Sequence, residues 1–178
     1  MLKKILVALA VLGVGLAGVV AYAAATQPDT FRVQRAATID APPEKLVGIL
    51  SDLRRGAEWS PYEKRDPDMK KTFSGPASGP GSKLEWDGNS DVGAGSLTVA
   101  EVTPAKVTLN LAMTRPMNAN NIVEYTFAPQ GNATNMTWAM HGPMPLISKV
   151  MCVFVDLDKM LGADMERGLK DLKALAER

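Results

Sequence analysis

The sequence begins with a long apolar run that limits where the rest of the chain can lie relative to a membrane. Residues 5–25 contain no charged side chain, and Lys3 and Lys4 stand directly before them. As an α-helix with a rise of about 1.5 Å per residue, this run would be about 31 Å long, close to the hydrocarbon thickness of a bilayer. The segment therefore predicts a membrane-spanning helix. The two lysines predict a cytoplasmic N-terminus, so we expect the remaining chain to be exported from the cytoplasm and held at the cell membrane by this single pass.

A secretory signal peptide is the alternative interpretation of the same segment. The basic start, the apolar stretch and the small residues Ala21, Ala23 and Ala25 fit an A-x-A cleavage pattern. The run exceeds the usual apolar region of a signal peptide, about 7–15 residues, which favours an uncleaved anchor. Cleavage would instead release a secreted or periplasmic domain. We divide the chain into an anchor or signal peptide (1–25), a linker (26–30) and one domain (31–178).

Composition limits what this domain can be and bind. After the apolar run 153 residues remain, and a domain of this size buries about 68–70% of its unfolded surface. The single cysteine, Cys152, cannot form an internal disulfide, so a packed core must supply the stability. Without the two N-terminal lysines the formal net charge changes from +1 to −1. The domain therefore lacks the positive field that nucleic-acid binding requires, and we expect no nucleic-acid partner.

Alternation of apolar and polar residues predicts a largely antiparallel sheet. Residues 31–40 alternate and predict a half-buried strand, after which Pro42 and Pro43 fit the first turn of a helix over about 42–52. A second short helical or turn segment is expected to end at Trp59, Ser60 and Pro61. Beyond it, Gly, Pro and Asn punctuate short alternating runs at intervals of about 8–12 residues, which is typical of a meander. The expected strands are 69–75, 81–88, 94–103, 106–115, 119–128 and 133–142.

The C-terminal stretch predicts the helix that covers this sheet. Its apolar residues recur three and four positions apart from Leu146 to Leu175, with charged residues between them. One helix over 146–176 would be about 46 Å long, more than such short strands need, so we expect a break near Asp156. Glu166 and Lys170 are spaced to form an ion pair along the helix. The sheet should then have one apolar face beneath the helix and one solvated face.

The order of these elements, with several local motifs, resembles a known superfamily. The motifs are RAATIDAPP at 35–43, EWSP at 58–61, GNSDVGAG at 88–95 and TWAM at 137–140. A β-α-α-β6-α order with these motifs is similar to the START-like (SRPBCC) superfamily, in its polyketide cyclase/dehydrase and lipid-transport branch. The resemblance covers about residues 31–176 and implies an α+β helix-grip fold, in which a curved antiparallel sheet closes on a long C-terminal helix around an apolar cavity. Most soluble relatives lack the N-terminal apolar run.

The residues expected to line that cavity are aromatic, leucine and methionine side chains on the inner strand faces, with one tryptophan near the entrance and one methionine on the closing helix. They are Trp59, Trp86, Leu111, Met113, Tyr125, Trp138, Met140 and Met151. Apolar walls with few polar groups suit a hydrophobic small molecule or a lipid. A filled core without a cavity would give the same pattern, because alternation does not distinguish the two.

Candidate catalytic groups are sparse. His141 is the only histidine, which excludes a metal site built from several histidines but leaves a general-base role open. The methionines could bind Cu(I), yet they continue the apolar stripes, so no metal or cofactor is expected. The predicted function is binding of a hydrophobic small molecule or lipid at the membrane without covalent catalysis. The alternatives are a cyclase/dehydrase-like enzyme that uses Tyr125, His141 or an inward carboxylate, and a protein-interaction module at the membrane surface.

Overall fold

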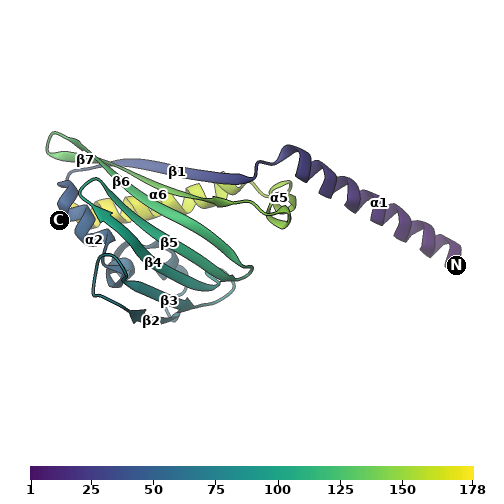
Figure 1. Cartoon of the computed structure of the whole chain (residues 1–178), viewed down its shortest axis with the longest axis horizontal. Helices are drawn as coiled ribbons and strands as arrows, with labels where there is room; N and C mark the ends of the chain where they lie inside the picture. The colour runs from purple at the N-terminus through teal and green to yellow at the C-terminus, as the bar shows by residue number, and fades with distance from the viewer.

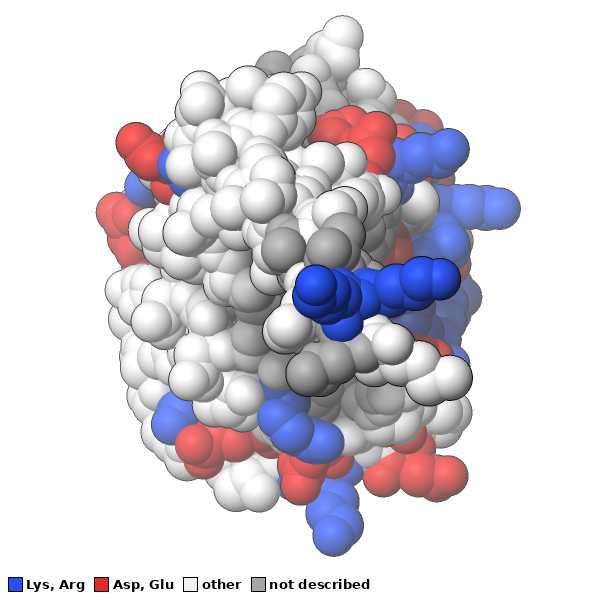
Figure 2. Space-filling view, turned by 90° about the vertical axis from the view of Figure 1, so that its right-hand side faces the viewer, with Lys and Arg blue, Asp and Glu red and all other residues white. Residues whose placement is uncertain are grey.

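The computed structural model describes the backbone of residues 1–178 and the side chains of residues 1, 3–6 and 11–178. Helix α1 (Leu2–Thr26) projects from one end of an α+β domain (Figure 1). From Lys3 to Thr26 it has the length and composition of a helix able to cross a membrane. Figure 2 views this end of the molecule and shows a broad uncharged surface, with most charged side chains toward the rim.

Seven antiparallel strands form one sheet in the order β1-β7-β6-β5-β4-β3-β2. They are β1 (Thr30–Ile39), β2 (Lys70–Ser74), β3 (Lys83–Asp87), β4 (Ala94–Thr103), β5 (Lys106–Arg115), β6 (Ala119–Gln130) and β7 (Ala133–Pro143). The last six form the expected meander, and β1 pairs with β7. Each strand begins and ends within two residues of its predicted bounds, because period-two alternation and turn residues specify both.

Short helices connect β1 to β2. They are α2 (Pro43–Leu50), η1 (Leu53–Arg55), α3 (Gly56–Trp59) and α4 (Pro61–Arg65). The predicted first helix is confirmed, with Pro43 in its first turn. Helix α3 ends before Pro61, as expected, but Pro61 also begins α4, which was not predicted. The first turn of a helix suits proline, because the N–H that proline lacks would have no partner there. The buried carboxylate of Asp164 pairs with Arg65 and Arg167, which ties the end of α4 to the C-terminal helix.

The C-terminal stretch forms α5 (Leu146–Cys152) and α6 (Leu157–Ala176), so the expected break is confirmed. Its cause is local: the Asp156 carboxylate accepts a hydrogen bond of 3.0 Å from the Lys159 N–H and caps α6. Helix α6 runs along one face of the sheet (Figure 1), and the core lies between them. The expected ion pair along the helix is not the one that forms, because Glu166 pairs with Arg35 of β1. This α+β architecture is the helix-grip fold that the sequence predicted.

Candidate functional site

Three of the predicted site residues form an aromatic cluster in the core. Trp59 comes from α3, Tyr125 from β6 and Trp138 from β7, and all three are buried. The Trp59 ring centroid lies 6.1 Å from that of Tyr125 and 5.5 Å from that of Trp138, both nearly edge to face. The Tyr125 and Trp138 centroids are 5.5 Å apart, because these residues are paired across β6 and β7. Such contacts stabilise aromatic groups in a fixed mutual orientation.

The cluster also holds polar groups inside the core. The Nε1–H of Trp138 is buried and has no hydrogen-bond partner among the described residues. Burial raises the pKa of Tyr125 well above its usual value and, together with the nearby Asp164 charge, raises the pKa of Tyr62 to about 12. Both phenols therefore stay protonated at neutral pH. An unpaired buried donor costs about 1–3 kcal/mol, a cost that an oxygen of a bound ligand could remove.

The other predicted lining residues divide between this core and the surface. Leu111 and Met140 are buried in the same core, and Trp86 and Met113 are half-buried against it. The Trp86 Nε1–H donates to the Val92 carbonyl at 3.2 Å. Met151 is not part of this group: it lies on α5 and is 46% exposed. The structure thus brings seven of the eight residues to the core and leaves one at the surface.

A groove of about 650 Å³ lies where α1 joins the domain. One wall is formed by the linker after α1 and the start of β1, with Phe31 as its largest apolar side chain. The other wall is formed by Met144 and by residues 152–158, which run from the last residue of α5 to the first turn of α6. None of the eight predicted residues lines this groove. Sequence reasoning missed it because its walls are far apart in the chain. The run of apolar residues from 150 to 155 is the available signal, but its spacing predicts a part of the covering helix.

The polar rim of the groove includes Arg32, which belongs to a small network on the outer face of the sheet. Its Nη1–H donates to Glu124 Oε2 at 3.2 Å, and His141 Nε2 lies 3.2 Å from the same oxygen. Burial by itself would raise the pKa of Glu124, but the hydrogen bond from Arg32, with the charges of His141 and Arg32, lowers it below its usual value. Since Glu124 and Tyr125 are consecutive in a strand, their side chains point to opposite faces. Tyr125 and His141 therefore do not share one site.

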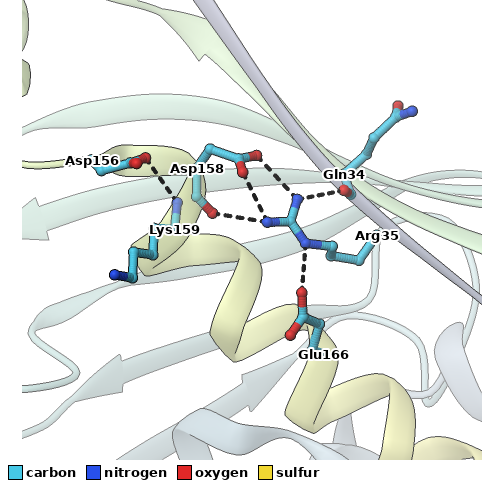
Figure 3. A network of polar contacts seen from close by, with 6 residues as sticks. All are labelled: Gln34, Arg35, Asp156, Asp158, Lys159 and Glu166. Atoms are coloured by element: carbon cyan, nitrogen blue, oxygen red, sulfur yellow. Dashed lines mark hydrogen bonds and ion pairs between the residues drawn. The ribbon is translucent and has the colours of Figure 1, made fainter.

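A second network fixes the start of α6 beside the groove (Figure 3). Arg35 of β1 points toward α6, and its guanidinium donates to Asp158 at 2.9 and 3.0 Å and to Glu166 at 2.8 Å. Gly162 makes room for it, because a Cβ at that position would overlap the guanidinium. The hydrogen bond from Arg35 lowers the pKa of the Asp158 carboxyl. Asp158 also lines the groove, so Arg35 positions one of its walls.

Sequence reasoning did not identify Arg35 as part of a site. The signal was its position in β1. Arg35 occupies the same alternating set of positions as Phe31, Val33 and Ala37, whose side chains face the core. A charged residue at an inward position of a half-buried strand requires a partner in the element that covers it.

Comparison with solved structures supports the fold. Protein CV1439 from Chromobacterium violaceum is 18% identical over 85% of this chain and 99% of its own, with a TM-score of 0.58. KanY is 16% identical over 84% of this chain and 99% of its own, with a TM-score of 0.63. DynU16, from the dynemicin biosynthetic locus, is 19% identical over 83% of this chain and 46% of its own, with a TM-score of 0.54. At these identities the similarity establishes the fold alone.

Family membership comes from the sequence itself. No curated protein matches the chain. Residues 30–177, which include the whole sheet and both C-terminal helices, match one protein family. The chain belongs to the polyketide cyclase / dehydrase and lipid transport family.

Proposed function

We propose that this protein binds a hydrophobic small molecule or a lipid in the groove beside α1, while α1 anchors it in the membrane. The observation that carries the proposal is the position of the groove. One wall begins with Gln27 and Pro28, the two residues that directly follow α1. A ligand that leaves the bilayer at the end of α1 would therefore find this groove at the start of the domain.

The chemistry of the groove suits an amphipathic ligand. Its apolar walls include Phe31, Met144 and Phe154, whereas Arg32 and Asp156 supply charge. A volume of about 650 Å³ lies within the range of small-molecule sites, about 300–1,000 Å³. An apolar chain would pack against the aromatic rings, and a polar head group would face the charged side chains. Lipid transport is among the roles for which the family is named, which agrees with this class of ligand.

The aromatic core is a second candidate for the binding position. The eight predicted lining residues remain a prediction of an interior cavity, and the unpaired Trp138 Nε1–H favours it, because a ligand oxygen would satisfy that donor. A ligand in the groove and a ligand in the aromatic core would be crosslinked to different peptides, so one experiment distinguishes the two positions.

The experiment is photocrosslinking in the full chain. The protein is reconstituted in dioleoylphosphatidylcholine nanodiscs that contain a diazirine-labelled fatty acid, and labelled peptides are mapped by mass spectrometry. A ligand in the groove would label residues 27–33 together with 152–158, and a ligand in the core would label the peptides of Tyr125 and Trp138. Labels on α1 serve as the internal control for access to the bilayer.

Matched variants test whether the label reports a specific site. Val153 lines the groove, so the larger side chain of Val153→Trp would occupy part of the groove volume and should lower the groove labels several-fold. Met113→Trp should lower only labels in the core. Both variants should leave labels on α1 unchanged. Labels confined to α1 in the wild-type chain would contradict ligand binding at either position.

A further inference from the structure

An apolar patch covers the outward side of α5 and of the turn that follows it. The patch consists of five large side chains: Leu146, Ile147, Met151, Phe154 and Val155. They are between 41% and 74% exposed, with Phe154 the most exposed. Contiguous exposed apolar side chains mark interaction surfaces in soluble proteins and membrane-binding surfaces in peripheral ones. We refer to these five residues as the α5 patch.

The single charge in this part of the chain is buried, and its partner is an exposed carboxylate of the linker after α1. Within residues 144–155 Lys149 is the only charged residue, and it is buried. Its Nζ donates to Asp29 Oδ1 at 2.6 Å, and this hydrogen bond lowers the pKa of the Asp29 carboxyl. A helix on the surface of a soluble domain normally turns its charged side chains outward and its apolar ones inward. Helix α5 does the opposite, so its outward face is suited to an apolar environment.

Helix α5 is held beside the end of α1. The two helices pack together, and Ala23 is fully buried, while the preceding Val19 and Val20 are half-buried. Asp29, two residues after Gln27, accepts the Lys149 hydrogen bond, and its carbonyl accepts a second bond of 2.7 Å from the Met144 N–H. One side-chain hydrogen bond and one backbone hydrogen bond therefore join the linker after α1 to the segment that contains α5.

This attachment places the α5 patch at the level where α1 would leave a membrane. The apolar run ends at Ala25, and Tyr22, an exposed residue of a type enriched at membrane interfaces, lies one turn earlier. Figure 2, which looks onto this end of the molecule, shows a wide uncharged area beside the basic side chains at its centre. We infer that the α5 patch inserts into the interfacial layer of the same bilayer that α1 spans, so that the domain is held against the membrane by two elements. The inference rests on the proposed anchoring by α1.

The α5 patch forms part of one groove wall, so insertion of the patch would also position the groove. Phe154 and Val155 belong both to the α5 patch and to the groove wall. Insertion of the patch would bring the groove opening to the level of the lipid head groups. A lipid could then pass between bilayer and groove along an apolar surface, without exposure of its chain to water.

The test measures the depth of single labels in the full chain. Cys152→Ser removes the only native thiol, and a cysteine is then introduced at Ile147, at Val14 in α1 or at Lys170 on the exposed side of α6. Each variant carries a thiol-linked nitrobenzoxadiazole dye in nanodiscs of dioleoylphosphatidylcholine with 5-doxyl or 12-doxyl lipid. All three side chains are exposed, so the labels do not disturb the core.

The expected result is a blue-shifted emission at position 147, with several-fold stronger quenching by the 5-doxyl lipid than at position 170. The label at position 14 should be quenched best by the 12-doxyl lipid, because it would lie deeper. A quenched label at 14 with a water-exposed, unquenched label at 147 would overturn this inference and leave the proposed anchoring intact. An unquenched label at 14 would overturn the anchoring itself. A blue-shifted label at 147 that lipid does not quench, and that depends on protein concentration, would assign the patch to a second copy of the chain and overturn the inference.

Discussion

At the scale of single residues, Gly168 sets the distance between α6 and the sheet. A Cβ at this position would lie 2.6 Å from Trp138 Cζ3 and 3.1 Å from Pro61 Cδ. Both neighbours are rigid rings, so neither can move aside cheaply. We expect Gly168→Ala to lower the free energy of unfolding by about 1–3 kcal/mol through overpacking, although alanine favours a helix by about 1 kcal/mol. Thermal unfolding of the full chain in detergent, followed by near-ultraviolet circular dichroism, measures the change.

Gly48 provides the matched control for this substitution. It lies in α2, and a Cβ there would have no neighbour within 4 Å. Gly48→Ala should therefore stabilise the chain by about 0.5–1 kcal/mol, because it reduces the backbone entropy lost on folding. Equal effects of the two substitutions would show that Gly168 does not control the approach of α6 to Trp138.

Alternation along strands could predict which residues face inward but not what they touch. It placed Tyr125 and Trp138 on the inner face correctly, because side-chain direction in a strand follows from position alone. The close contact of Gly168 with the Trp138 ring depends on how α6 crosses the sheet. No local sequence pattern contains that information.

At the scale of elements, the attachment of α6 depends on Arg35. We expect Arg35→Met to lower the melting temperature at neutral pH, because the substitution leaves Asp158 and Glu166 without their shared cation. Arg35 holds the pKa of the Asp158 carboxyl below its usual value of 3.8. The stabilisation is therefore present above pH 3.8 and is lost as the pH falls through the lower pKa of the folded state.

The measurement compares melting temperatures of wild type and Arg35→Met across a pH series. The difference should be largest near neutral pH and should shrink below about pH 4. Lys83→Met is the control, because the exposed Lys83–Glu85 pair joins two residues of the same strand and links no other element to it. Parallel curves for wild type and Arg35→Met across the whole pH range would contradict a role for the ion pair.

The strands and the long helices were predictable, whereas the groove was not. Turn residues and alternation specify the meander, and the capping residue Asp156 marks the start of α6. The groove arises from the pairing of β1 with β7, which brings the start of β1 beside the segment that follows β7. Sequence periodicity describes each of these segments separately, so it gave no sign that they would form the two walls of one groove.

At the scale of the whole molecule, α1, the groove and the α5 patch lie at one end of the domain (Figure 1). The opposite end, where α6 finishes, is closed by contacts of its own: the Asp40 N–H donates to Glu177 Oε1 at 2.8 Å, and Lys173 pairs with the same carboxylate at 2.8 Å. The backbone hydrogen bond from Asp40, with that of Lys173, lowers the pKa of Glu177. The two ends of the domain therefore differ: one is held together by these contacts, and the other carries α1, the groove and the α5 patch.

This arrangement predicts that the N-terminal segment stays attached to the domain. A peptidase needs an extended, accessible segment, whereas α1 is helical through Thr26 and Ala23 of the A-x-A pattern is buried beside α5. We expect the chain purified from membranes to retain residues 5–25 by intact-mass measurement and to remain in the pellet after alkaline carbonate extraction. Gly18→Pro is the control, because proline inside a helix costs about 3 kcal/mol and should expose the sites that follow it. That variant should yield a shortened product, and a wild-type chain that begins at Ala24 or Thr26 would show that packing against α5 does not protect the segment.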